Sequence, residues 1–201
     1  NLALELKKIY LEVVICNGIE NNALKILKNK KNLRIIDSSE LDNIDLNNIS
    51  SQLNSLLIQT TDTLPFSKSN FKVVSKIKPS SKTLKNLIFA FNVCRFVKSN
   101  AIVITNNDST IGIGSGQPSR LDSCEIAISK MNKFYKEKKD DEIIAASDAF
   151  FPFVDGIEKL VQSGISAVIQ PSGSVNDKEI IKFANRTNTI LVFSKTRHFK
   201  H

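Results

Sequence analysis

The chain has 201 residues, of which 41% are hydrophobic and 7% aromatic, a composition that supports a packed core and excludes global disorder. Its 28 basic and 20 acidic side chains leave a net charge of +8, which favours an anionic partner such as a nucleotide, a folate or a nucleic acid. Lysine runs on a solvated surface explain the same charge without any partner, so charge alone selects no function.

The cysteines and the apolar runs indicate the compartment. Cys16, Cys94 and Cys124 are far apart and form no CxxC pair, and their odd number argues against a disulfide framework. No apolar run reaches the roughly 18 residues of a membrane span, and no signal peptide is visible. These features predict a cytoplasmic protein. Because the chain starts without Met in a helix-like pattern, we expect it to be part of a longer protein.

The first 79 residues are expected to contain the end of one subdomain and a connection. Residues 1–37 have the pattern helix, strand, helix, strand, with β-branched runs at Tyr10–Ile15 and Leu33–Ile36. They are expected to close a first subdomain. Residues 38–79 are expected to form an irregular connection. Its first part, residues 38–66, is rich in Asp, Asn and Ser and has room for a short helix, and Phe71–Ile77 predicts a strand that ends at Pro79.

A second subdomain is expected over residues 80–201. Ser80 or Ser81 can cap a first helix, and Ser119 can cap a second. Between these helices, two short strands are joined by a tight turn of Asn and Asp residues. The later elements are predicted as strand 143–146, helix 155–163, strand 165–169, helix 176–187 and strand 190–194.

This order predicts an α/β fold. A hairpin opens the sheet, and helical crossovers then add parallel strands, which gives a mixed sheet in a three-layer α/β/α arrangement. The order of elements resembles the cytidine-deaminase-like fold. The H-x-E and P-C-x-x-C motifs of the zinc deaminases are absent, so deamination is excluded and no zinc site is expected.

Unusual segments fall at the strand ends, where ligands of such sheets bind. Gly112–Arg120 offers glycines for close backbone approach and an arginine fork for phosphate or carboxylate, although a structural turn with a solvated arginine is the alternative. Ser147–Phe153 contains three phenylalanines, which either fill the core or line a pocket for a flat heterocycle. Asp155 can cap a helix or bind an aminopyrimidine-type edge, and Asn100 can hydrogen-bond locally or bind a carboxamide.

Two further segments follow later strands. The amides and hydroxyls of Gln170–Ser174 can bind an anion or a polar ring edge, or can form an ordinary turn before the next helix. The basic tail Lys195–His201 can be disordered, or it can fold back with Arg197 as an anion clamp. His198 and His201 lack an acidic or cysteine partner at ligand spacing, so no metal site is expected.

Several long motifs together resemble one known family. They are VKSNAIV (97–103), IGIGSGQPSR (111–120), SDAFFPFVDGI (147–157), AVIQPSGSVND (167–177) and RHF near the C-terminus. These segments resemble the AICAR transformylase part of the bifunctional purine biosynthesis proteins. The similarity is dense over residues 82–201 and looser over residues 10–29.

The resemblance implies a transferase that moves a formyl group from 10-formyltetrahydrofolate to the ribotide AICAR. It also implies two cytidine-deaminase-like subdomains and a homodimer whose active sites lie between subunits. The family's catalytic Lys-His pair and its IMP cyclohydrolase domain are expected upstream of Asn1, so this chain is expected to hold no catalytic residue and to be inactive alone. The site residues carried over by motif are Asn100, Arg120, Phe150 and Arg197 at the ribotide, Leu121, Asp155, Ser172 and Gly173 at the folate, and Phe153 and Phe199 in the pocket walls.

Two other functions stay open on the same scaffold. A non-enzymatic nucleotide- or RNA-binding module would use the same basic pockets, with aromatic rings on an open strand face. A scaffold that serves only assembly would leave Arg120 and Arg197 replaceable. The phenylalanines cluster in one loop, which favours the transferase, and that interpretation requires both arginines to converge with the Phe150 loop at one cleft.

Overall fold

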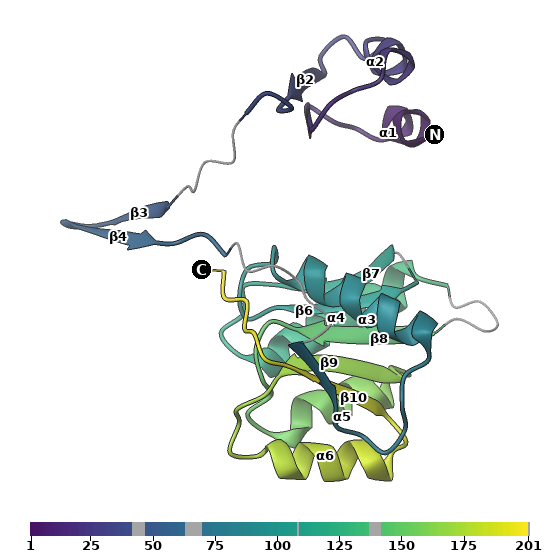
Figure 1. Cartoon of the computed structure of the whole chain (residues 1–201), viewed down its shortest axis with the longest axis vertical. Coiled ribbons are helices and arrows are strands. Elements are labelled where there is room, and N and C mark those ends of the chain that lie inside the picture. The colour runs from purple at the N-terminus through teal and green to yellow at the C-terminus, as the bar shows by residue number, and fades with distance from the viewer. Residues whose placement is uncertain (42–46, 63–69, 108, 137–141, 201) are drawn as a thin grey trace. The chain divides into compact units, whose positions relative to one another are not determined.

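The structure is a computed structural model that describes residues 1–41, 47–62, 70–107, 109–136 and 142–200 (Figure 1). The chain divides into two compact units, Asn1–Thr61 and Asp62–His201. Within the described ranges, no helix combines the length and apolar character that a membrane span needs.

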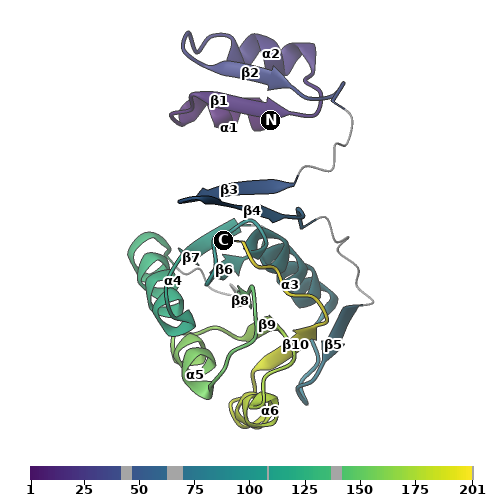
Figure 2. The same cartoon turned by 90° about the vertical axis from the view of Figure 1, so that its left-hand side faces the viewer.

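The first unit is built from short elements. Strands β1 and β2 pair in parallel, and β3 and β4 form an antiparallel hairpin, as Figure 2 shows. The helix, strand, helix, strand pattern expected for residues 1–37 is confirmed, with the strands starting later than predicted. The elements are α1 (Leu2–Lys8), β1 (Val13–Cys16), α2 (Asn21–Leu27), β2 (Arg34–Asp37), β3 (Asn48–Gln52) and β4 (Ser55–Gln59).

The expectation of an irregular stretch over residues 38–66 was wrong where the structure describes the β3–β4 hairpin. The strand predicted at Phe71–Ile77 is present but shorter, as β5 (Phe71–Val73). The hairpin turns at Leu53, whose φ of 52° lies in the left-handed region. Such turns usually carry Gly or Asn at that position, and the absence of that signal hid the hairpin from sequence patterns. The residues of β4 are exposed throughout, so no in-and-out alternation marked it either.

The second unit is a six-stranded mixed sheet between helices. The strand order is β5-β10-β9-β8-β6-β7, in which β8, β9 and β10 are parallel while β6 runs antiparallel to both β7 and β8. The elements are β5 (Phe71–Val73), α3 (Ser81–Cys94), β6 (Ile102–Asn106), β7 (Ser109–Gly114), α4 (Arg120–Phe134), β8 (Ile143–Ser147), α5 (Val154–Gln162), β9 (Ala167–Pro171), α6 (Asp177–Arg186) and β10 (Ile190–Ser194).

Helices cover both faces of this sheet. In Figure 2, α3 lies on one side, and α4, α5 and α6 lie on the other. Alternate residues of β6 follow this division, because Ile102 and Ile104 pack in the core under α4 to α6 while Val103 packs in the core under α3. The predicted three-layer α/β/α fold is thereby confirmed. One boundary differs, since β5 pairs with β10 and the sheet therefore begins before residue 80.

Serine caps begin two of the helices, as predicted. The hydroxyl of Ser80 accepts a hydrogen bond from the Thr83 amide at 3.0 Å, and that of Ser119 accepts one from the Asp122 amide at 3.0 Å. Each such cap stabilises its helix by about 1 kcal/mol. The caps fix where α3 and α4 start, and therefore where Arg120 leaves its loop.

Candidate functional site at the carboxyl edge of the sheet

The segments singled out in the sequence meet at one edge of the sheet. Because β6 runs against its neighbours, its first residue Ile102 pairs with Gly114 at the end of β7 and with Ser147 at the end of β8. Strands β9 and β10 are parallel, so Ser194 at the end of β10 pairs with Pro171 at the end of β9. The loops that follow these strands, and the residues that precede β6, therefore share one edge.

The C-terminal segment crosses this edge. The amide of Ser172 donates to Ser194 O at 3.2 Å, the amide of His198 donates to Asp148 O at 3.1 Å, and the amide of Ser99 donates to Lys200 O at 2.8 Å. These bonds carry the segment from β10 past the ends of β9 and β8 to the start of β6. The yellow trace that ends at C in Figure 1 follows this path. The basic tail thus folds back over the strand ends.

Arg120 is held by a buried carboxylate. Its Nε donates to Ser147 Oγ at 2.9 Å, and its Nη2 donates to Asp148 Oδ1 at 2.8 Å. The Asp148 side chain is completely buried, and 10% of the Arg120 side chain is exposed. The second carboxylate oxygen, Oδ2, accepts from Ser99 Oγ at 2.5 Å. Asp148 therefore joins the end of β8 and the segment before β6 to the first turn of α4.

No role was predicted for Asp148 from the sequence. One signal was present, because Asp148 directly follows the apolar run of β8, and a carboxylate that is buried at such a position needs a partner. Its partner, Arg120, was identified as a ligand contact, while the structure shows its guanidinium already neutralised within the chain.

Arg197 lies on the outside of the same edge. Its side chain is exposed, and its Cζ lies 5.9 Å from the ring centroid of Phe199, which is also exposed. The residue between them, His198, is buried and bonds to the backbone of Asp148. Asp148 thus places both arginines. Its carboxylate pairs with Arg120, and its backbone carbonyl accepts from the amide of His198, the neighbour of Arg197.

The Phe150 loop and the Ser172 loop are neighbours. A Cβ atom added to Gly173 would lie 4.0 Å from Cδ1 of Phe150, and the φ of Gly173, +117°, is one that glycine adopts without strain. The amides of Gly173 and Ser174 donate to the carboxylate of Asp177 at 2.8 and 3.3 Å. In this structure the Asp177 carboxylate occupies the amides that were expected to bind an anion.

Two glycines of the 112–120 segment, Gly112 and Gly114, lie at the end of β7 and make room for α4. A Cβ on Gly112 would lie 2.2 Å from Ala127 O, and a Cβ on Gly114 would lie 1.9 Å from Ser123 O. Both positions therefore allow α4 to lie close against β7. Of the three glycines, only Gly116, with a φ of +67°, shapes the turn itself.

Asn100 binds the loop beside it. Its Nδ2 donates to Gln117 O at 2.9 Å and to Pro118 O at 3.1 Å, while its own carbonyl accepts from Ser123 Oγ at 2.8 Å. These contacts are the local hydrogen bonds that the sequence left open as an alternative. They hold the loop in front of α4. Leu121, which follows Arg120 in α4, is half-buried.

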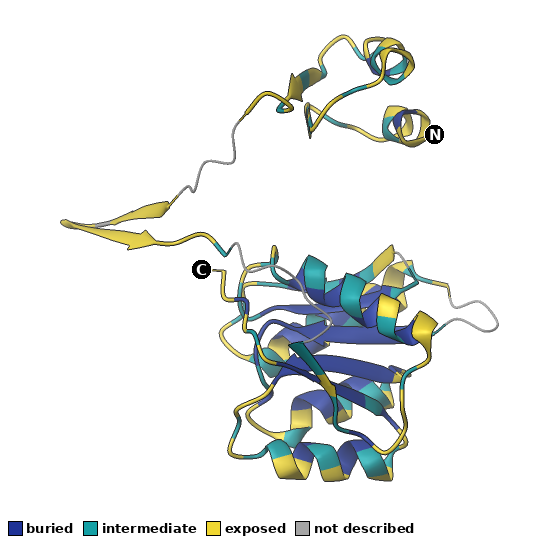
Figure 3. Ribbon diagram, in the orientation of Figure 1, coloured by how far each residue is buried: buried dark blue, intermediate teal, exposed yellow. Residues whose placement is uncertain are grey.

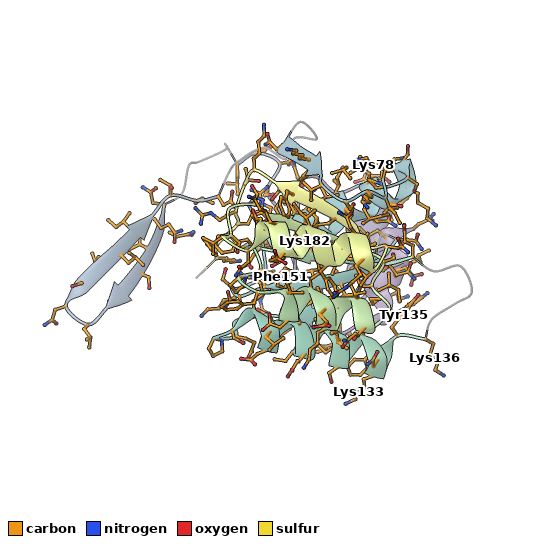
Figure 4. The ribbon with its side chains drawn as sticks, turned by 90° about the horizontal axis from the view of Figure 1, so that it is seen from below. Lys78, Lys133, Tyr135, Lys136, Phe151 and Lys182 are labelled. Carbon is orange, nitrogen blue, oxygen red and sulfur yellow. The ribbon has the colours of Figure 1, made fainter. Side chains whose placement is uncertain are left out.

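The three neighbouring phenylalanines have different environments. Phe151 is 1% exposed and packs on Gly156, so it fills the core as one alternative predicted. Figure 4 shows Phe151 inside the second unit, whereas Lys133 projects from its surface. Phe150 is half-buried, and Phe153 is 62% exposed at the start of α5. Asp155 is also exposed, and its Oδ1 accepts from the Gly156 amide at 2.7 Å.

The Cys94 thiol is buried beneath this edge. Burial raises the pKa of Cys94 well above its ordinary value, and the nearby Asp148 carboxylate raises it further. Within the described ranges, no three His, Cys, Asp or Glu side chains lie together as metal ligands would.

Comparison with known proteins connects this geometry to one family. The profile of the AICARFT/IMPCHase bienzyme family matches residues 1–130. The bifunctional purine biosynthesis protein PurH of Lactobacillus acidophilus is 39% identical over 201 residues, which are 99% of this chain and 38% of that protein. The protein of the same name from Buchnera aphidicola subsp. Schizaphis graminum is 44% identical over 97% of this chain and 37% of its own length.

A third relative gives the same result. PurH of Caldicellulosiruptor bescii is 44% identical over 100% of this chain and 38% of its own length. The chain thus spans less than two fifths of the length of these relatives. The family match covers well over half of the chain, and it confirms the resemblance found in the sequence motifs. The chain belongs to the AICARFT/IMPCHase bienzyme family.

Proposed function

We propose that this chain is the C-terminal part of an AICAR formyltransferase, which transfers the formyl group of 10-formyltetrahydrofolate to the amine of AICAR in purine biosynthesis. The observation that carries the proposal is the C-terminal segment lying across the strand ends, with Arg197 exposed beside the buried Arg120–Asp148 pair. Family membership supports it, since the relatives are named as bifunctional purine biosynthesis proteins.

The chemistry of AICAR matches the groups at this edge. The ribotide carries a phosphate, a carboxamide and a flat aromatic ring. Arg197 is the exposed guanidinium and suits the phosphate, because a guanidinium binds phosphate oxygens bidentately. Phe150 offers a half-buried ring face for the heterocycle. Asn100 has both of its amide donor contacts on the neighbouring loop, which leaves its side-chain oxygen for the carboxamide.

Arg120 has a different task from Arg197. Two of its nitrogen atoms bind Ser147 and Asp148, so its charge is offset inside the chain. We assign to it the positioning of the β8 end and a single remaining contact to the ribotide. We propose that the folate binds next to the ribotide, at the loop of Ser172 and Gly173, and the closeness of this loop to Phe150 supports that proposal.

The proposed reaction needs three things. The amine of AICAR is a poor nucleophile, so catalysis requires orientation, removal of a proton and stabilisation of an oxyanion. The residues at this edge supply orientation and anion binding. The ring of His198 points into the protein and is 2% exposed, so it is not the general base at the edge. We propose that the proton-transfer groups lie elsewhere in a full-length protein, which assembles as a homodimer in the cytoplasm.

Isothermal titration of AICAR into the 201-residue chain tests this proposal. Arg197→Ala should weaken AICAR binding by about tenfold or more, because a charge-assisted contact contributes about 1.5–3 kcal/mol. Lys195→Ala is the matched control, since it removes an exposed positive charge two residues away in the same segment and should change little. No AICAR binding, or equal binding by Arg197→Ala, would reject the proposal. Tighter binding of single-stranded RNA, with a steep salt dependence, would favour the nucleic-acid module.

A further inference from the structure

His198 separates the two exposed side chains of the C-terminal segment. It is 2% exposed, whereas its neighbours Arg197 and Phe199 are exposed. Its imidazole packs on Phe91 of α3, with ring centroids 4.8 Å apart and ring planes inclined by 58°. The segment is therefore anchored by an inward ring and presents its cation outward.

The inward ring has a specific polar partner. Nδ1 of His198 lies 2.5 Å from Oδ2 of Asp62. Asp62 is in turn bound by Arg95 at the end of α3, whose Nη2 donates to the Asp62 carbonyl and lies 3.6 Å from its Oδ1. Asp62 thus links the C-terminal segment to α3.

The contact between Nδ1 and Asp62 sets the orientation of the His198 ring, because Nε2 makes no competing hydrogen bond among the described residues. Nε2 of His198 is buried and has no hydrogen-bond partner among the described residues. A buried nitrogen without a partner costs free energy, so the imidazole is held by the Nδ1 contact and by its packing. The backbone is fixed as well, because the His198 amide donates to Asp148 O at 3.1 Å. His198 is therefore held on two sides.

We propose that His198 is a positioning residue for Arg197, which it holds outward over the sheet edge to receive the phosphate of the ribotide. The inference rests on the proposed function, in which Arg197 is the phosphate contact. Because Asp62, Phe91 and Asp148 fix the adjacent residue, the Arg197 backbone is ordered before ligand arrives. Ordering in advance increases affinity, since binding then does not have to restrict a mobile segment.

The test compares two substitutions at His198. His198→Phe keeps a ring against Phe91 and removes the contact with Asp62, while His198→Asn retains a side-chain N–H donor. His198→Phe should weaken AICAR binding by between about twofold and about tenfold, the range spanned by the net contribution of one hydrogen bond. Binding of the corresponding nucleoside, which lacks the phosphate, should not change. His198→Asn should restore part of the AICAR affinity.

A double-mutant cycle separates positioning from general stability. In an Arg197→Ala background, His198→Phe should cause no further loss of AICAR binding, because its effect passes through Arg197. An equal loss in both backgrounds, or an equal loss for the nucleoside, would overturn the inference. Should His198→Phe fail to fold, Asp62→Asn weakens the same contact from its half-exposed side and takes its place in the cycle.

The outcomes also distinguish this inference from the proposed function. A loss of AICAR affinity in Arg197→Ala with none in His198→Phe overturns the positioning role alone. No loss in either variant overturns the proposed function together with the inference that rests on it.

Discussion

The two units of the chain differ in how they bury their strands. In the second unit, β8 and β9 are buried along their whole length, and helices cover both faces of the sheet. Among the described residues of the first unit, the buried hydrophobic side chains are Ala3 and Leu27, and every residue of β4 is exposed. Figure 3 shows this contrast between the dark blue central strands of the second unit and the yellow strand β4 of the first.

The contrast explains where the site residues lie. Every site residue expected from the sequence belongs to the second unit, in the loops and helix starts beside the strand ends or in the C-terminal segment. Groups that orient a ligand need rigid support, and buried strands provide it.

The largest expected effect comes from removing the carboxylate under the site edge. Asp148→Ala leaves Arg120 as an unpaired buried cation, and breaking such a pair typically costs about 3–5 kcal/mol. Hydrogen exchange followed by mass spectrometry should show faster exchange in β6, β8 and β9, with no change in β1 and β2. Asp148→Asn is the control, because it keeps the shape and the contact with Ser99 and should cost less. Unchanged exchange in β8 would show that the pair does not support the edge.

A second pair of substitutions measures the contrast directly. Leu160→Ala removes a completely buried side chain of α5 and should reduce the free energy of unfolding by about 2–5 kcal/mol. Leu57→Ala makes the same change in β4, where the side chain is 55% exposed. This substitution should change the free energy of unfolding by about 0.5 kcal/mol or less. Urea denaturation followed by circular dichroism compares them. Equal losses would mean that the hairpin is covered in solution.

Local sequence patterns predicted the second unit well because its central strands β8 and β9 are fully buried. A strand at residues 190–194 was predicted, and β10 occupies those residues. Continuous β-branched runs mark such strands, and Ser80 and Ser119 mark the helix starts that follow loops. The common edge of the site segments followed from the same order of elements, since helical crossovers place strand ends together.

Contacts between distant residues could not be predicted in this way. Nothing local in the sequence shows that Asp148 pairs with Arg120, or that Gly114 faces Ser123 of α4 and not a ligand. The anchor between His198 and Asp62 joins residues 136 positions apart. These contacts depend on which elements become neighbours, and that is known only when the sheet order is known. The β3–β4 hairpin was missed for a different reason. The residues of β4 are all exposed, so no alternation of apolar and polar residues marks the strand in the sequence.

The smallest expected effect is a difference in the labelling rates of the three thiols. Measuring these rates compares the two units without a substitution that changes their packing. Cys94 and Cys124 are completely buried in the second unit, while Cys16 in β1 is half-exposed. Burial raises the pKa of Cys124 from its ordinary value of 9.0 to about 12, although the charge of Arg120 opposes this. At pH 8, a disulfide reagent should therefore label Cys16 well before the other two, as mass spectrometry of the peptides would show.

The raised thiol pKa also predicts a dependence of stability on pH. The folded state holds the Cys124 proton more tightly than the unfolded chain does, so the contribution is complete below pH 9. As the pH rises from 9 towards 12, the unfolded chain loses this proton first, and stability should fall. Cys124→Ala should flatten that decline, measured as the urea midpoint between pH 8 and pH 11. Rapid labelling of all three thiols at pH 8, with no difference in the decline, would show that the second unit opens as readily as the first.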